Sequence, residues 1–325
     1  MKLFEFDPES FSKEKFVVGG INTYVYNSSV LQDYVSSFNN KTKVNEIPIY
    51  VHYLVHHRQG DYTYTEATAY NVLKQFYAKK EKVDIPLICV TFDNRNHGER
   101  LVDTKSNSSW KSGNDTHAVD MISSIEGNIA DLKLIMEFLP SYLNLDYYVS
   151  EDLKKEYITD IRFRNILSGY SLGGHTIIRF ANRYPDLVEI INPVVGCNDM
   201  SSLLINRLNK RKEDSNDFYK KYFYFHYKEL EFDDDQKKKY YPESFHKLVS
   251  RQDQEIFENF PMTKIKMFAA YGADDQLVPT SLSRVWAELY DNTNEDTEIF
   301  IQEGVGHDCT PEMIERFTTW LAKQI

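Results

Sequence analysis

The chain has 325 residues, 42% hydrophobic and 27% charged, enough for one large globular domain with an insertion. Its 49 acidic and 38 basic residues give a net charge of −11, which argues against nucleic acid or an anionic membrane as its partner, because phosphates attract surfaces rich in Lys and Arg. No apolar run has the length of a membrane span or a secretory signal, and no segment marks a local basic patch.

Apolar runs and amphipathic stretches alternate along the chain. A hairpin of antiparallel edge strands is expected at residues 17–26. Buried parallel strands are expected at 47–55, 86–92, 165–167, 188–195, 265–271 and 298–301. Helices are expected at 66–79, at 121–139 with Pro140 as the stop, after residue 171, and in stretches ending near 290 and 324. This alternation predicts an α/β fold with a doubly wound, mostly parallel sheet, whose carboxyl-end loops carry the functional site.

One stretch interrupts the alternation. Residues 201–261 contain no strand-like run and are charged, rich in tyrosine and expected to be helical. We therefore expect a core in two parts, 1–200 and 262–325, with a helical cap insertion at 201–261 between them. Aromatic residues gather at 218–227, either as the roof of a substrate pocket, with Tyr222 and Phe225 as substrate-binding residues, or as packing that fixes the insertion to the core.

The cysteines and histidines indicate a compartment and argue against a metal. Three cysteines, Cys89, Cys197 and Cys309, cannot all pair within the chain and form no Cys-x-x-Cys motif. We expect reduced thiols in a cytoplasmic protein. Adjacent histidines such as His56 and His57 seldom share one ion, so we expect no metal and no other cofactor.

Three segments, far apart but in a fixed order, supply the groups that acyl transfer by covalent catalysis requires. Residues 169–173 satisfy Gly-x-Ser-x-Gly, in which the serine occupies a strained turn between a strand and a helix. Asp274 and Asp275 follow a later expected strand, and His307 follows the last one. This order predicts Ser171 as the nucleophile and His307 as the general base.

The arrangement resembles the α/β-hydrolase superfamily, from about residue 47 to the C-terminus. The order Ser, Asp, His matches that fold and not the chymotrypsin or subtilisin order. Residues 53–60 look like the family's oxyanion loop, and residues 91–98 look like the turn after the next strand. The Asn-His-Gly turn and the loop ending in His-x-Arg-x-Gly look most like the dienelactone-hydrolase and prolyl-oligopeptidase-like branch, and the chain is similar to poorly characterised fungal hydrolases.

The resemblance implies an oxyanion hole with two donors. One is the backbone N–H of Leu172, directly after the nucleophile. The other is expected on the loop after the 47–55 strand, where we assign Arg58. The family pattern usually has Gly after the first His of this loop, and here His57 takes that place.

The resemblance also bears on the acid. In related hydrolases the carboxylate stands two positions before a hydrophobic pair that ends in Pro, as Asp275 does relative to residues 277–279. Asp274 is the neighbouring alternative. Asp93 and Asp199, also at expected strand ends, are further alternatives, with turn capping as their structural role.

These residues together predict a carboxylesterase-like serine hydrolase (EC 3.1) that cleaves a carboxylic ester or thioester of a small to medium acyl substrate through an acyl-enzyme on Ser171. Peptide cleavage by an acylaminoacyl-peptidase-like enzyme is one alternative. The other is a non-catalytic protein that uses this fold to bind a ligand. The acyl and alcohol parts of the substrate depend on the shape of the pocket beneath the insertion.

Overall fold

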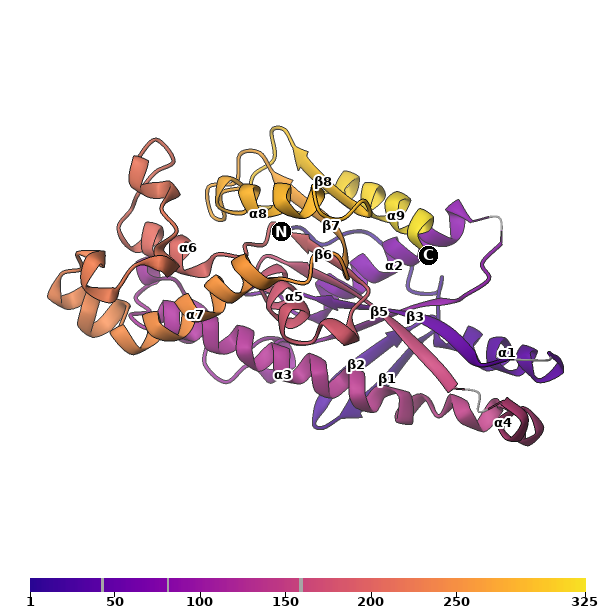
Figure 1. Cartoon of the computed structure of the whole chain (residues 1–325). Helices are drawn as coiled ribbons and strands as arrows, with labels where there is room; N and C mark the ends of the chain where they lie inside the picture. Colours follow the sequence, from indigo (N-terminus) through magenta and orange to yellow (C-terminus); the bar gives the residue numbers. More distant parts are fainter. Residues whose placement is uncertain (42–43, 81, 158–159) are drawn as a thin grey trace.

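A single eight-stranded sheet forms the centre of the molecule (Figure 1). The computed structural model describes residues 1–41, 44–80, 82–157 and 160–325. The strand order is β1-β2-β4-β3-β5-β6-β7-β8; β1 and β2 form an antiparallel hairpin, β2 runs antiparallel to β4, and β3 to β8 are parallel. The predicted doubly wound, mostly parallel sheet is confirmed. The strands are β1 Lys13–Val18, β2 Ile21–Tyr26, β3 Glu46–Val55, β4 Leu87–Phe92, β5 Asp160–Tyr170, β6 Ile190–Val194, β7 Lys266–Gly272 and β8 Thr297–Gln302.

Helices cover both faces of the sheet, because successive side chains of a buried parallel strand point to opposite faces. In β3, Val51 and Tyr53 enter one hydrophobic core, whereas Tyr50 and Leu54 enter the other. Helices α2 and α9 pack on the second core, and α1, α3, α5 and α8 pack on the first. No helix among the described residues is long and apolar enough to cross a membrane. The helices are α1 Leu31–Ser36, α2 Tyr62–Lys79, α3 His117–Leu143, α4 Glu151–Tyr157, α5 Leu172–Arg183, α6 Met200–Leu208, α7 Glu243–Asn259, α8 Ser281–Asp291 and α9 Pro311–Gln324.

Helix α3 differs from the expectation that Pro140 stops it. It runs from His117 to Leu143 with Pro140 inside its last turn, so the predicted end at residue 139 was wrong. A proline removes one hydrogen bond to the residue four positions earlier, and Leu143 packs on the core just beyond it. The helix ends at Asn144, which takes the left-handed conformation (φ 46°) and donates its N–H to the Pro140 carbonyl at 3.0 Å.

The segment between β6 and β7 is helical, and no residue of 201–261, all of which the structure describes, lies in a strand. Helices α6 and α7 are joined by short 3₁₀ and π turns, and Figure 1 shows the segment at one end of the molecule, beyond the end of β6. A buried ion pair between Arg179 of α5 and Asp253 of α7 fixes it to the core. The Asp253 carboxylate also accepts the N–H and the hydroxyl of Ser201, each at 2.6 Å. The helical character agrees with the expectation, and the domain boundaries at 200 and 261 stay a prediction.

Candidate active site

Ser171 occupies the turn between the end of β5 and the first residue of α5. Its backbone has φ 52° and ψ −107°, a conformation that costs a non-glycine residue free energy and persists only where the surroundings hold it. The Ser171 N–H donates to the Val194 carbonyl at 2.9 Å, which ties the turn to β6. The hydroxyl is thereby presented at the carboxyl edge of the sheet.

Two glycines make this turn possible. A Cβ on Gly169 would lie 2.2 Å from the carbonyl oxygen of Gly173. A Cβ on Gly173 would lie 2.0 Å from the carbonyl oxygen of Val55. Both obstacles are backbone atoms that cannot turn aside, so strand β5, helix α5 and the end of β3 approach this closely only with glycine at both positions.

The structure brings together the three residues of the predicted triad. His307 Nε2 lies 2.7 Å from Ser171 Oγ, and His307 Nδ1 lies 2.7 Å from Asp275 Oδ2. The other carboxylate oxygen, Asp275 Oδ1, accepts the N–H groups of Leu277 and Val278 at 2.8 Å each. Because a carboxylate only accepts, His307 carries its proton on Nδ1, and its Nε2 is free to accept the Ser171 proton.

The other candidate carboxylates have different partners. Asp274 is exposed, whereas Asp275 is buried against the histidine. Asp93 accepts the backbone N–H groups of Tyr62 and Glu99 at 2.7 and 2.8 Å. Asp199 caps α6. The geometry therefore favours Asp275 as the carboxylate that orients His307.

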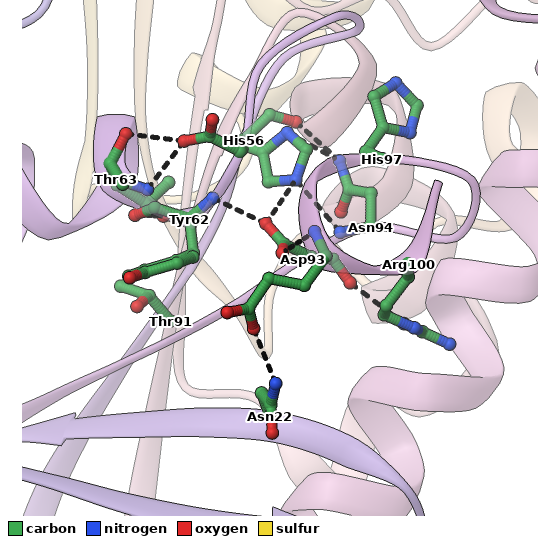
Figure 2. A network of polar contacts seen from close by, with 12 residues as sticks. Asn22, His56, Tyr62, Thr63, Thr91, Asp93, Asn94, His97 and Arg100 are labelled. Atoms are coloured by element: carbon green, nitrogen blue, oxygen red, sulfur yellow. Dashed lines mark hydrogen bonds and ion pairs between the residues drawn. The ribbon is translucent and has the colours of Figure 1, made fainter. Parts of the chain in front are cut away.

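Figure 2 shows how the loop after β3 is fixed to the turn after β4. His56 Nε2 accepts the Asn94 N–H at 2.9 Å, and the Asn94 side-chain amide donates to the His56 carbonyl, also at 2.9 Å. Since Nε2 accepts, the ring proton is on Nδ1, which donates to the His57 carbonyl at 2.8 Å. Burial lowers the pKa of His56 to about 3, so the ring is neutral. His56 is thus a structural anchor for the loop that carries Arg58.

The two expected oxyanion donors lie on adjacent segments. Leu172 is the first residue of α5, where backbone N–H groups have no partner within the helix. Val55 pairs with Gly169 across β3 and β5, so Arg58 and Ser171 continue two neighbouring strands. In the described ranges, neither the Leu172 nor the Arg58 backbone N–H has a hydrogen-bond acceptor.

A cleft of about 950 Å³ begins at the loops that flank the triad. Ser171 and His307 are not among its lining residues, but Arg58 and residues 276–279, next to Asp275, are. Six of the lining residues are Lys or Arg and two are acidic, so the structure has a local basic patch that the sequence analysis did not identify. Sequence reasoning missed Arg207, Trp110 and His117 on its walls, and the consecutive basic residues 210–212 were the available signal. The lining residues are Arg58, Ser109, Trp110, Lys111, His117, Leu203, Asn206, Arg207, Leu208, Lys210, Arg211, Lys212, Glu213, Phe218, Asp233, Gln236, Tyr240, Gln276, Leu277, Pro279 and Leu282.

Tyr222 and Phe225, predicted to bind substrate, do not line this cleft, whereas Phe218 does. Tyr222 is 3% exposed, and its hydroxyl donates to the Asp217 carbonyl at 2.9 Å. Its ring lies 5.3 Å from that of Phe225 and 5.0 Å from the Arg211 guanidinium. The two aromatic rings therefore pack against each other, and Tyr222 supports a cleft-lining arginine. A role of Tyr222 and Phe225 in substrate binding stays a prediction.

No protein-family model matches the chain, and no curated protein matches it in sequence. Among solved structures, it is similar to TT1662 from Thermus thermophilus, with 13% identity over 96% of this chain and 97% of that one and a TM-score of 0.52. The chain has the α/β-hydrolase fold. Two esterases have slightly lower TM-scores. Esterase Pf2001 from Pyrococcus furiosus has 13% identity over 99% of this chain and 97% of that one, with a TM-score of 0.49. Est1E from Butyrivibrio proteoclasticus with bound ferulic acid has 12% identity over 96% and 97% of the two chains, with a TM-score of 0.48. Identities this low bear on the fold alone.

Proposed function

We propose that this protein is a serine hydrolase that cleaves a carboxylic ester or thioester through an acyl-enzyme on Ser171. The observation that carries the proposal is the continuous hydrogen-bonded chain from Ser171 Oγ through His307 to Asp275, with two contacts of 2.7 Å. The strained conformation of Ser171 supports it, because such strain persists mainly where function uses it.

In the proposed mechanism, Ser171 Oγ attacks the carbonyl carbon while its proton moves to His307 Nε2. The backbone N–H groups of Leu172 and Arg58 stabilise the negative charge that develops on the carbonyl oxygen. Collapse of the tetrahedral intermediate breaks the bond to the leaving alcohol or thiol, which takes the proton from His307. Water then attacks the acyl-enzyme, gives its proton to His307, and the acid is released as Ser171 recovers its proton. Asp275 holds the Nδ1 proton of His307 throughout.

Two further proposals concern the branch of α/β-hydrolases that the enzyme resembles most and its location in the cell. We place it nearest the dienelactone-hydrolase and prolyl-oligopeptidase-like branch, supported by the motifs of residues 53–60 and 91–98, whose loops are hydrogen-bonded to each other (Figure 2). We also propose a cytoplasmic location, supported by three buried cysteines that are free thiols.

The test is covalent labelling with a fluorophosphonate probe together with turnover of 4-nitrophenyl esters of graded acyl length. Ser171→Ala should abolish labelling, and Ser171→Ala and His307→Ala should each reduce kcat by several orders of magnitude, about 10³-fold or more. Ser123→Ala, at an exposed serine of α3 that does not line the cleft, is the matched control and should keep both signals. Retention of more than about a tenth of the activity by Ser171→Ala would overturn the assignment of the nucleophile.

A further inference from the structure

The cleft beside the triad has a charge opposite to that of the whole protein. The chain carries a net charge of −11, yet six cationic side chains line the cleft against the two carboxylates of Glu213 and Asp233. Burial lowers the pKa of His117 to about 3, so this lining residue is neutral. The cleft therefore has an excess of four positive charges. The cations are Arg58, Lys111, Arg207, Lys210, Arg211 and Lys212.

Two of these cations are half-buried without an anionic partner. In the described part of the chain, no carboxylate oxygen lies within 4.0 Å of the guanidinium of Arg58 or of Arg207. Arg207 Nε donates to the Leu277 carbonyl at 3.1 Å, and Arg58 Nη1 lies 3.1 Å from His117 Nδ1. Each guanidinium has five N–H donors, so both keep donors for a ligand.

The pKa values of Arg58 and Arg207 also indicate a site for an anion. Burial lowers the pKa of Arg58, and burial together with the nearby charge of Arg58 lowers the pKa of Arg207 to about 10. Two like charges that repel each other in a partly dehydrated place destabilise the empty protein. An anion bound between them relieves that repulsion.

The two arginines are also tied to the proposed catalytic loops. Arg58 belongs to the loop that supplies the expected second oxyanion donor. Arg207 is bonded to Leu277, whose own N–H donates to the Asp275 carboxylate. Because Ser171 does not line the cleft, a group bound there is separate from the bond that is cleaved.

We propose that this cleft binds a phosphate-bearing group of the ester or thioester substrate, with Arg58 and Arg207 as its specificity-determining contacts. The inference rests on the proposed hydrolase function. A phosphate suits the site better than a single carboxylate because it carries about two negative charges and three acceptor oxygens, which matches several cations around one cleft. A volume of about 950 Å³ also accommodates a group larger than a single phosphate.

Two matched substrate pairs test the proposal and distinguish the side of the scissile bond. Butyryl-4′-phosphopantetheine and butyryl-pantetheine share an acyl group and differ only in the phosphate of the leaving thiol. The 4-nitrophenyl esters of 4-phosphonobutanoic acid and pentanoic acid differ in charge on the acyl side. We expect kcat/KM to favour the charged member of at least one pair by about 10-fold or more, mainly through KM. Added KCl should weaken that preference.

Arg207→Gln should reduce the preference about 10- to 100-fold, the range expected from loss of charge-assisted hydrogen bonds. Arg207→Lys should restore part of it. Arg251→Gln removes an exposed arginine of α7 and serves as the control with the same change of charge, so it should keep the preference.

Failure of this proposal is separable from failure of the proposed function. If wild-type protein is labelled at Ser171 but favours the neutral member of both pairs, the proposed hydrolase function is supported and the proposed phosphate site is refuted. Preference only for the mono-4-nitrophenyl ester of glutaric acid would also overturn it, in favour of a carboxylate site. A preference that Arg207→Gln leaves intact would remove Arg207 from the site. Absence of labelling in wild-type protein would instead refute the proposed function.

Discussion

The Asp275→Asn variant gives a sharp test of the proposed triad, because the structure fixes which atom of the new amide faces His307. In wild-type protein, Asp275 Oδ1 accepts two backbone N–H groups and Oδ2 accepts His307 Nδ1. An asparagine keeps its one oxygen where the two backbone donors require an acceptor, so its NH₂ group faces His307. Nδ1 must then accept, the ring proton moves to Nε2, and Nε2 can no longer take the proton of Ser171.

The expected loss is about 10³- to 10⁴-fold in kcat, equivalent to about 4 to 5.5 kcal/mol of activation free energy. KM should change little, because Asp275 is buried behind the histidine. The assay is turnover of a 4-nitrophenyl ester by wild-type protein, Asp275→Asn and Asp274→Asn, with thermal unfolding to verify that all three fold. Asp274 is the neighbouring exposed carboxylate, and its variant should retain nearly full activity. The reasoning is refuted if Asp275→Asn keeps more than about a tenth of wild-type kcat, or if Asp274→Asn is the inactive variant.

Two further predictions concern stability. Asp253→Ala should lower the free energy of unfolding, measured in urea, by about 3 to 5 kcal/mol, because Arg179 would stay buried without its charged partner. The control is Asp186→Ala, which breaks a surface ion pair and should leave the urea midpoint nearly unchanged. Burial lowers the pKa of four histidines from 6.5 to about 3, so the unfolded chain binds more protons than the folded chain between these two pH values. The stability that they contribute is therefore complete above pH 6.5 and is lost as the pH falls toward 3. Between pH 7 and 5 each histidine should lower the free energy of unfolding by about 2 kcal/mol. Thermal unfolding from pH 7 to 5 should show this decline, and His52→Gln should reduce its slope; equal slopes would contradict the argument. The four are His52, His56, His117 and His175.

The sequence predicted the parts of the fold that local pattern determines. Central strands such as β4 and β7 are continuous apolar runs, and parallel strands bring their carboxyl ends to one edge. Ser171, Asp275 and His307 each follow such a strand, so their meeting at that edge follows from their order in the chain. The choice between Asp274 and Asp275 depended on the resemblance to known hydrolases, and the contact with His307 agrees with that choice.

Features that depend on long-range packing were not accessible in the same way. An aromatic run shows that rings will be buried, but not against which surface, and the contact of Tyr222 with the Arg211 guanidinium is such a surface. Arg207 is one charged residue on an amphipathic helix, and its place in the cleft depends on α6 lying against the loop after β7. Local preference, which is visible in sequence, predicts a helix stop at Pro140, whereas the packing of Leu143 that continues the helix is not visible there.

The attachment of α7 to α5 limits how the cleft can open. A hinged movement of the entire insertion would have to separate Arg179 from Asp253 and expose both charges, a motion that their burial opposes. Residues 209–242 are held differently, because short turns replace any long helix between α6 and α7. A movement of this connection, which also carries the basic residues 210–212, would widen the entrance without breaking that ion pair. Three of the six cations that line the cleft would then move with this piece of chain, whereas Arg58 and Arg207 lie outside it.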